Sequence, residues 1–395
     1  MVKKTKLSAG WVGLYNGIAF LNFLLLPCFN NFAWAQQPAD SGKAAAPEIH
    51  LLEPSKPMER ELQGGEINTY EISLAANQYL QVHADQHSVD VIVTVIAPDG
   101  NQLSEIYTRF YGLEQISIVA KVAGIYRLHA RAFAKDAPRG GYGLWIETGR
   151  NATPEDNDRM AAENVTSQGK QFLAKGLAED IRRAREKYEQ AVLLWHKIGD
   201  RYGEALAING ISFTCMWVGE LRKAKTHCEQ ALALYRALGN RFGEGEVLHN
   251  LAAIYSAFGD KKRAIELYEQ ALSLRRAVRD RQGEGLTLSN FGGAYFSLGE
   301  LQKAKNYFEQ ALTLLREVND RAGEAIPLNG LAKVYMIWGQ EKQALEHLTQ
   351  ALTLSQTINN RRAEVYTLLN LGQHYALKAD KQKARILWPS ASSFS

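Results

Sequence analysis

The chain has 395 residues, of which 46% are hydrophobic and 22% are charged. This composition is typical of a folded protein with two or three domains and excludes a disordered or fibrous chain. The formal net charge is +4, and three of the positive charges are lysines near the start of the chain. The remainder is close to neutral, which argues against nucleic-acid binding through overall charge.

The first predicted element is an export signal over residues 1–35. Its start is basic, the stretch Leu7–Phe29 is largely apolar, and an A-x-A cleavage site ends at Ala35. An uncleaved membrane anchor and a lipoprotein signal at Cys28 are the alternatives. Pro27 stands where a lipoprotein signal needs a small residue, and two asparagines interrupt the apolar stretch. The sequence therefore predicts a cleaved signal and an exported protein, periplasmic or extracellular, without stable membrane insertion after cleavage.

Residues 36–57 are rich in Ala, Pro, Ser and Gly, which predicts a linker. From residue 58 polar and apolar residues alternate, and short strands separated by turn signals predict a small antiparallel β-sandwich over residues 58–150. The Asp99-Gly100 step predicts a hairpin turn. The candidate strands are residues 70–74, 80–84, 89–96, 116–119, 125–130 and 142–146.

Two segments of this region, Asp90–Gly100 and Ala123–Leu128, resemble the pre-peptidase C-terminal module of secreted bacterial peptidases. The resemblance implies that the region adopts the β-sandwich fold of that module. A carbohydrate or a cell-wall polymer is one hypothesis for its ligand. A polar segment up to residue 158 closes the region.

After the sandwich, a phrase recurs every forty residues. E-Q-A-L contains Ala231, Ala271 and Ala311, and close variants of the phrase contain Ala191 and Ala351. A fixed period of this size predicts stacked helical units that share one continuous core. Residues 158–395 are therefore predicted to form an all-α solenoid of about five repeats plus an incomplete sixth, so the fold class is a β-sandwich followed by an α-solenoid.

Within one unit, Leu288 and Tyr295 mark a face of a first helix, while Ala304, Phe308 and Ala311 mark a second helix. Small residues let the two helices approach closely, and large rings fill the gaps between them. This pattern resembles the tetratricopeptide repeat. The resemblance implies antiparallel helix pairs and a concave groove that binds a protein or peptide ligand.

A second phrase, [Asp/Asn]-Arg-x-[Gly/Ala]-Glu, follows each of those alanines ten residues later. Its Asp or Asn is predicted to cap the next first helix, and its Glu lies in the positive first turn. The alternative is a ligand-binding row of Arg and Glu. The arginines concerned are Arg201, Arg241, Arg281, Arg321 and Arg361.

A row of amides on the first helices is the candidate peptide-binding site: Asn209, Asn250, Asn290, Asn329 and Asn370. The resemblance implies that such asparagines line the groove and hold an extended peptide by its backbone. An amide suits this task because it offers both a donor and an acceptor. The alternative is bonding between neighbouring first helices. The five occupy two adjacent helix positions, which point about 100° apart.

No catalytic motif occurs in the sequence: it has no H-E-x-x-H, G-x-S-x-G, Walker loop or Cys-x-x-Cys. We therefore predict no enzymatic activity, no catalytic residues and no cofactor. A metal site is not predicted either, because four ligands at ordinary spacing are absent. The nearest approach to one is His83, Asp85, His87 and Asp90, for which the alternative is a polar loop between strands.

Two cysteines, Cys215 and Cys228, fall within one predicted helical hairpin and face each other across it. A disulfide between them could persist in an exported protein. The alternative is a pair of small core residues, because other repeats place Tyr or Phe at these positions. The sequence leaves both interpretations open.

The order of parts resembles the front half of bacterial CHAT-type proteins, as do the segments Arg185–Ala191 and Leu194–Arg201. The resemblance implies a caspase-like peptidase domain after the repeats, and no such domain follows here. Pro389 falls inside the expected last helix, where proline costs ~3 kcal/mol. We therefore expect a truncated or frameshifted product whose uncapped end is prone to association.

Taken together, these features predict a non-enzymatic, exported scaffold that binds peptide or protein segments in its groove. The first alternative is the sensor half of a CHAT-type peptidase without its catalytic domain. The second is a protein that binds carbohydrate or cell wall through the sandwich. The sequence does not identify the partner.

Overall fold

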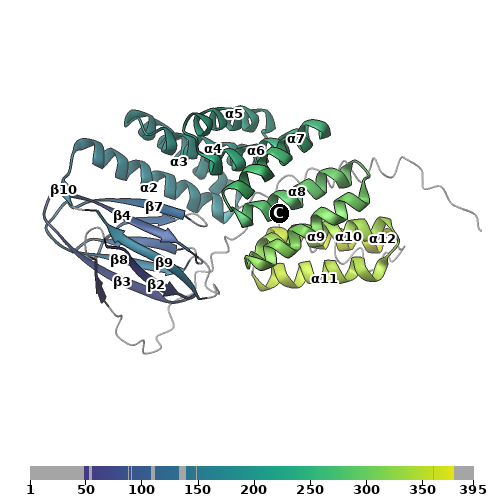
Figure 1. Cartoon of the computed structure of the whole chain (residues 1–395), viewed down its shortest axis with the longest axis horizontal. Helices are drawn as coiled ribbons and strands as arrows, with labels where there is room; N and C mark the ends of the chain where they lie inside the picture. Colours follow the sequence, from purple (N-terminus) through teal and green to yellow (C-terminus); the bar gives the residue numbers. More distant parts are fainter. Residues whose placement is uncertain are drawn as a thin grey trace, which may run out of the picture. The chain divides into compact units, whose positions relative to one another are not determined.

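The computed structural model describes residues 49–52, 56–87, 89, 91–107, 112–132, 139–147, 149–358 and 360–377 (Figure 1). The predicted export signal and the proline-containing end of the last repeat lie outside these residues. The chain divides into two compact units. One ends at Ile211 and holds the strands, two helices and the start of a third, while the other begins at Ser212 and holds the following helices.

The strands form two five-stranded sheets. The first has the order β1-β3-β8-β5-β6, and the second has the order β10-β4-β9-β2 with β7 also beside β4. Neighbours are antiparallel except β1 and β3, which are parallel. The strands are β1 (Ile49–Leu51), β2 (Met58–Leu62), β3 (Ile67–Leu74), β4 (Gln78–Gln86), β5 (Val91–Ile96), β6 (Gln102–Tyr107), β7 (Gly112–Val119), β8 (Gly124–Ala132), β9 (Gly140–Ile146) and β10 (Arg150–Asn151).

Each of the six candidate strands overlaps an observed strand, and the Asp99-Gly100 step joins the β5–β6 hairpin. Four observed strands were not among the candidates: β1, β2, β6 and β10. β6 was not predicted, because its sequence, QLSEIY, alternates weakly. β1 lies inside the predicted linker, so the linker assignment is wrong for Ile49–Leu51. These residues gain order by pairing with the edge of β3, which a composition pattern does not reveal.

The core of the sandwich contains a hydrogen bond between its two sheets. Tyr70 on β3 and Tyr142 on β9 are fully buried, and their hydroxyl oxygens are 2.6 Å apart. Asn68 Nδ2 donates to the same Tyr142 oxygen at 2.8 Å. Because a buried hydroxyl without a partner is costly, these bonds let two large polar rings fill the core.

Helix α2 packs on strands β6 and β7 of the sandwich. Glu163 accepts hydrogen bonds from the Ser117 amide (2.8 Å) and from Ser117 Oγ (2.9 Å). Burial raises the pKa of the Glu163 carboxyl to about 7. Ser167 Oγ donates to the Glu105 carbonyl in the same interface. The first hairpin is therefore fixed to the sandwich and not only to the repeat that follows it.

Eleven helices lie in the described residues; the first ten form five antiparallel pairs, and α12 begins the next repeat. Those from α4 onward are each 17 residues long. We call α4, α6, α8, α10 and α12 first helices and α5, α7, α9 and α11 second helices. The bounds are α2 (Pro154–Lys175), α3 (Ala178–Lys197), α4 (Arg201–Trp217), α5 (Leu221–Ala237), α6 (Arg241–Ala257), α7 (Lys261–Ala277), α8 (Arg281–Ser297), α9 (Leu301–Glu317), α10 (Arg321–Ile337), α11 (Glu341–Thr357) and α12 (Arg361–Leu377).

The predicted helix caps are confirmed. Asn240 Oδ1 accepts from the Gly243 amide at 2.8 Å, and Asp280 Oδ1 accepts from the Gly283 amide at 2.9 Å. Each bond satisfies an amide at the start of a first helix that has no partner within the helix. Asp200, Asp320 and Asn360 make the same bond.

The glutamate of the same phrase ties each second helix to the next first helix. Glu284 accepts from Arg276 Nε at 2.7 Å. Equivalent pairs join Arg236 to Glu244 (2.7 Å) and Arg316 to Glu324 (3.1 Å). The recurring Glu therefore has a structural role, which favours that interpretation over a ligand-binding row.

Small residues and large rings interlock as the repeat pattern requires. Phe308 is fully buried on α9, between Gly292 of α8 and Gly330 of α10. A β-carbon on Gly292 would lie 2.8 Å from the ring, and one on Gly330 would lie closer still. Both glycines are therefore needed for close approach.

Cys215 and Cys228 are buried and are not joined by a disulfide. Burial raises the pKa of the Cys228 thiol to about 12. The interpretation as small core residues is therefore confirmed, and the disulfide is not formed. Among the described residues, no helix is long and apolar enough to cross a membrane.

Candidate functional site

The first helices of the second unit form a continuous row. α6 packs on α8, α8 on α10, and α10 on α12. Between the second helices α7 and α9, by contrast, a pocket opens. Closer packing along the first helices places them on the inner side of the curved stack. We call α6, α8, α10 and α12 the inner row.

The structure places the predicted amides at the contacts between first helices. Asn290 is half-buried. The other four are between 0% and 3% exposed: Asn209, Asn250, Asn329 and Asn370. Asn209 belongs to the first unit and the rest belong to the second. Burial of this degree leaves four of the amides little surface for a ligand.

One hydrogen-bond pattern connects α6 to α8. His249 Nδ1 and Thr287 Oγ1 are 3.0 Å apart, and Thr287 Oγ1 donates to the Gly283 carbonyl. Asn290 Nδ2 and His249 Nε2 are 3.1 Å apart. Burial lowers the pKa of His249 well below its ordinary value, so the ring is neutral and can accept from the Asn290 amide. The ninth residue of one first helix thus bonds to the seventh and tenth of the next.

The same pattern recurs between α10 and α12. Asn329 Nδ2 donates to Thr367 Oγ1 at 2.9 Å, and Asn370 Nδ2 donates to Asn329 Oδ1 at 2.7 Å. The two adjacent positions of the amide row are therefore donor and acceptor partners across a helix contact. This explains why the amides alternate between positions that point in different directions.

The pattern is interrupted between α8 and α10. Ser289 holds the ninth position of α8, and its Oγ is buried without a partner among the described residues. The corresponding positions of α10 are Pro327 and Gly330, which offer no side-chain hydrogen-bonding group. Asn290 Oδ1 is also buried and has no hydrogen-bond partner in the described ranges. Ser289 Oγ and Asn290 Oδ1 therefore remain available for a hydrogen bond to a ligand at the middle of the inner row.

Basic side chains lie at the end of the inner row. Lys333 Nζ donates to Tyr366 Oη at 2.5 Å, and burial lowers the pKa of this lysine to about 7. Arg362 lies one turn before Tyr366 on α12, and its Cζ is 3.8 Å from the ring centroid of Trp217 at the end of α4. Burial lowers the pKa of Arg362 to about 10.

Two polar atoms at this end have no hydrogen-bond partner within the part of the chain that the structure describes. They are Arg362 Nη1 and Gln373 Oε1, both buried and both on α12. A buried donor left unsatisfied costs about 1–3 kcal/mol, and more when it is charged. An acceptor supplied by a ligand would remove that cost.

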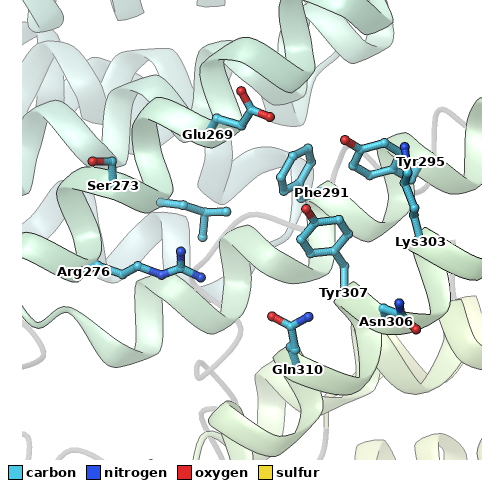
Figure 2. A pocket seen from close by; sticks show the side chains of 10 residues that line it. Glu269, Ser273, Arg276, Phe291, Tyr295, Lys303, Asn306, Tyr307 and Gln310 are labelled. Atoms are coloured by element: carbon cyan, nitrogen blue, oxygen red, sulfur yellow. The ribbon is translucent and has the colours of Figure 1, made fainter.

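A separate pocket of about 780 Å³ opens between α7 and α9, over α8 (Figure 2). Tyr307 of α9 lies 4.5 Å, centroid to centroid, from Phe291 of α8 and is stacked on Tyr295 at 5.3 Å. Lys303 Nζ lies 5.1 Å from the Tyr295 centroid. From α7, Glu269 and Arg276 extend toward the opening.

The metal candidates of the sandwich are not brought together. His83 Nε2 is 3.0 Å from Glu147 Oε1, while His87 lies near Glu59 and Asp85, each at 3.4 Å. Asp90 is outside the described residues. No group of three or more His, Cys, Asp or Glu side chains that could hold a metal ion occurs in the residues that are described.

Sequence reasoning missed the basic end of the inner row and the pocket. A signal for both was present in the repeat itself, compared position by position. Lys333 stands where the other first helices have Phe, Ala, Gly or Gln, and Tyr307 stands where neighbouring second helices have His or Leu. Departures from a repeat mark the residues that its packing does not require.

The comparisons with known proteins concern the solenoid. No curated protein sequence matches the chain. Similar solved structures include BtubC from P. vanneervenii (21% identical, TM-score 0.43, 55% of this chain and 88% of that chain). Another is aspartyl phosphate phosphatase F from Bacillus subtilis (15% identical, TM-score 0.48, 61% of this chain and 72% of that chain). A third is the Rap conjugation gene regulator of the plasmid pLS20 in complex with the Phr* peptide (15% identical, TM-score 0.49, 60% of this chain and 67% of that chain).

These structural similarities are to a fold and carry no functional inference. The family model of the tetratricopeptide repeat, in contrast, matches residues 203–277 and 283–357. The matched segments coincide with the helix pairs from α4/α5 to α10/α11. The chain therefore contains tetratricopeptide repeats, arranged as an α-helical solenoid.

Proposed function

We propose that this protein is an exported, non-enzymatic scaffold that captures a peptide or protein segment along its inner row. The observation that carries the proposal is Arg362 Nη1 on the inner row, a buried donor atom without a hydrogen-bond partner among the described residues. Asn290 Oδ1 and Gln373 Oε1 supply acceptors on the same row. Together they offer a donor and acceptors to the backbone and side chains of an extended segment.

The chemistry at the end of the row favours a segment that carries a carboxylate. Arg362 presents a guanidinium, whose planar fork matches a carboxylate in two parallel hydrogen bonds. Trp217 holds one face of that guanidinium, so its orientation is fixed before a ligand arrives. The carboxylate comes from an Asp or Glu side chain or from a chain terminus.

The predicted amide row enters this proposal in two parts. Asn290, half-buried and with a free acceptor, is proposed to contact the segment directly. Asn209, Asn250, Asn329 and Asn370 are proposed to contribute by fixing the spacing and curvature of the first helices. Direct capture by these four would require the first helices to separate and expose them.

A peptide array tests the proposal with the full chain. Blocked peptides of acidic, basic and neutral composition are presented at equal density, and bound protein is measured. We expect retention on acidic peptides, and Arg362→Gln should weaken it about tenfold, which corresponds to ~1.4 kcal/mol. The matched control is Arg361→Gln, since Arg361 is exposed and pairs with Glu364.

The amides are tested on the same array. Asn290→Ala should weaken retention, and Asn250→Ala should weaken it less, while helicity by circular dichroism stays unchanged in both. Equal retention by the wild type, Arg362→Gln and Asn290→Ala would overturn the inner row as the binding surface.

Export is the cellular half of the proposal and rests on the basic and apolar leader with its A-x-A site. The mass and N-terminal sequence of the protein recovered from the producing cell test it, and cleavage after Ala35 is expected. A mature protein that retains the leader would contradict it.

A second candidate function is polymer binding through the sandwich, and one side-chain pair favours it. Trp145 on β9 is half-buried and is stacked on His83, with ring centroids 5.2 Å apart and planes 9° apart. A fixed indole ring on a sheet is a suitable platform for the apolar face of a sugar. Trp145→Ala in the full chain should then abolish retention on insoluble cell-wall polymer.

A further inference from the structure

The pocket between α7 and α9 lies where the repeat departs from its own pattern. In the flanking repeats the glutamate of E-Q-A-L is paired with a lysine four residues earlier, as Lys225–Glu229 (2.6 Å) and Lys305–Glu309 (2.5 Å). Glu269 has Ile265 in that place. Within the described residues Glu269 makes no ion pair, so its carboxylate faces the pocket without a counter-ion.

Two aromatic residues of the pocket, Phe291 and Tyr307, also depart from the repeat, and we call them the aromatic wall. Phe291 stands where the other first helices have Ile or Leu, and Tyr307 stands where α5, α7 and α11 have His, Leu and His. Their rings lie 4.5 Å apart. Stacking on Tyr295 holds Tyr307 in position, with the two planes only 8° apart. On α11 the matched His347 is also stacked on a tyrosine, Tyr335, with ring centroids 5.5 Å apart, so the departure lies in the larger phenol ring of Tyr307 combined with Phe291.

The charges that line the pocket are unequal in their pairing. Arg276 is paired with Glu284 at 2.7 Å, and Lys303 is paired with Glu300 at 2.6 Å. Both cations are thus already neutralised by carboxylates of the protein. Glu269 is the charge that remains, so the pocket attracts positive ligands.

We propose that this pocket binds an organic cation that carries an aromatic or bulky apolar group. Its ammonium or guanidinium pairs with Glu269, and its apolar group lies against Leu272, Phe291 and Tyr307 (Figure 2). A volume of about 780 Å³ is in the range of small-ligand sites, which combine an apolar lining with a few polar groups. Phe291 and Tyr295 of this site lie on α8, but the site contains none of Arg362, Asn290 and Gln373, which the proposed function uses.

Two matched probes test the charge preference with the full chain. Tryptamine and indole-3-propionate share one ring and differ in the sign of their charge. Isothermal titration calorimetry should show tryptamine binding at least about tenfold more tightly. Glu269→Gln should remove that preference, while Glu229→Gln, the same change in a repeat without the pocket, should leave it intact.

The aromatic wall is tested by Tyr307→Leu, which installs the residue found at the same position of α7. It should weaken tryptamine and indole-3-propionate alike and leave helicity unchanged, which separates loss of the site from loss of the fold. Arg362→Gln should have no effect on either probe, so failure of the inner-row proposal is recognised independently.

The source of the cation is decided by a third probe, the blocked dipeptide acetyl-tryptophanyl-lysine amide. Tighter binding of the dipeptide than of tryptamine assigns the pocket to a protein partner, and the reverse order assigns it to a free amine. Equal binding of tryptamine and indole-3-propionate, no binding of either, or an unchanged preference in Glu269→Gln would overturn the proposal.

Discussion

The inner row and the α7–α9 pocket are built from the same forty-residue repeat, yet their polar groups are used differently. In the inner row, the side chains of Asn329, Thr367 and Asn370 form hydrogen bonds with one another between α10 and α12. In the pocket, Glu269 has no ion-pair partner within the part of the chain that the structure describes, and Ile265 stands where the flanking repeats have the pairing lysine. Residues that follow the repeat hold the solenoid together, whereas residues that depart from it are the better candidates for binding.

The largest expected effect is on stability, and it compares two adjacent residues: one that packs between helices and one that lines the pocket. Phe308→Ala should lower the free energy of unfolding by about 3–5 kcal/mol, because it empties the space between Gly292 and Gly330. Tyr307→Ala, one residue earlier, should cost much less, because Tyr307 is half-buried at the pocket wall. Urea denaturation followed by circular dichroism measures both. Similar losses for the two variants would remove the distinction between the regions.

The second effect concerns pH and the basic end of the inner row. In the unfolded chain Lys333 holds its proton up to its ordinary pKa of 10.5, whereas burial lowers the folded pKa to about 7. Between these values the unfolded state binds more protons, so stability rises with pH.

Lys333→Met should remove this contribution. We expect the wild type to gain stability relative to Lys333→Met, on the order of 2 kcal/mol between about pH 7 and pH 9, measured by urea denaturation at each pH. Parallel pH profiles for the two proteins would show that folding does not lower the pKa of Lys333. Lys303→Met, at the exposed rim of the pocket, is the control and should leave the profile unchanged.

The third effect compares two amides. Asn329→Ala should destabilise the protein by about 1–3 kcal/mol, because Asn370 and Thr367 lose their buried partner. Asn306→Ala, at the exposed rim of the pocket, should change stability by less than about 0.5 kcal/mol. Thermal denaturation of both variants checks the pair. A larger loss for Asn306→Ala would contradict the assignment of structural amides to the inner row.

The smallest effect tests the turns that both regions share. Arg279 adopts a left-handed backbone (φ 58°) where Gly199 and Gly239 stand in earlier repeats (φ 71° and 64°). Arg279→Gly should therefore raise stability by about 0.5–1 kcal/mol, since a left-handed side-chain residue costs ~1–2 kcal/mol and glycine loses part of that gain to entropy. Gly239→Arg should lower stability, and a gain from that change would contradict the explanation.

Local sequence was sufficient for the elements that repeat or alternate. The caps at Asn240 and Asp280 followed from residue type and spacing, because a cap needs only a side chain and the amide three residues later. The strand around Tyr70 followed from its alternation. β1 did not, because three residues gain order only from the free edge of β3.

The sequence by itself determined that this chain carries a helical solenoid behind a β-sandwich, since both follow from periodicities that each residue reports locally. Only the tertiary structure decided what the asparagines do, because a donor on one first helix meets an acceptor that lies about forty residues earlier in the chain. The same holds for Glu269 and Tyr307. Their pocket is lined by residues of α7, α8 and α9, so it forms only when these three helices pack together.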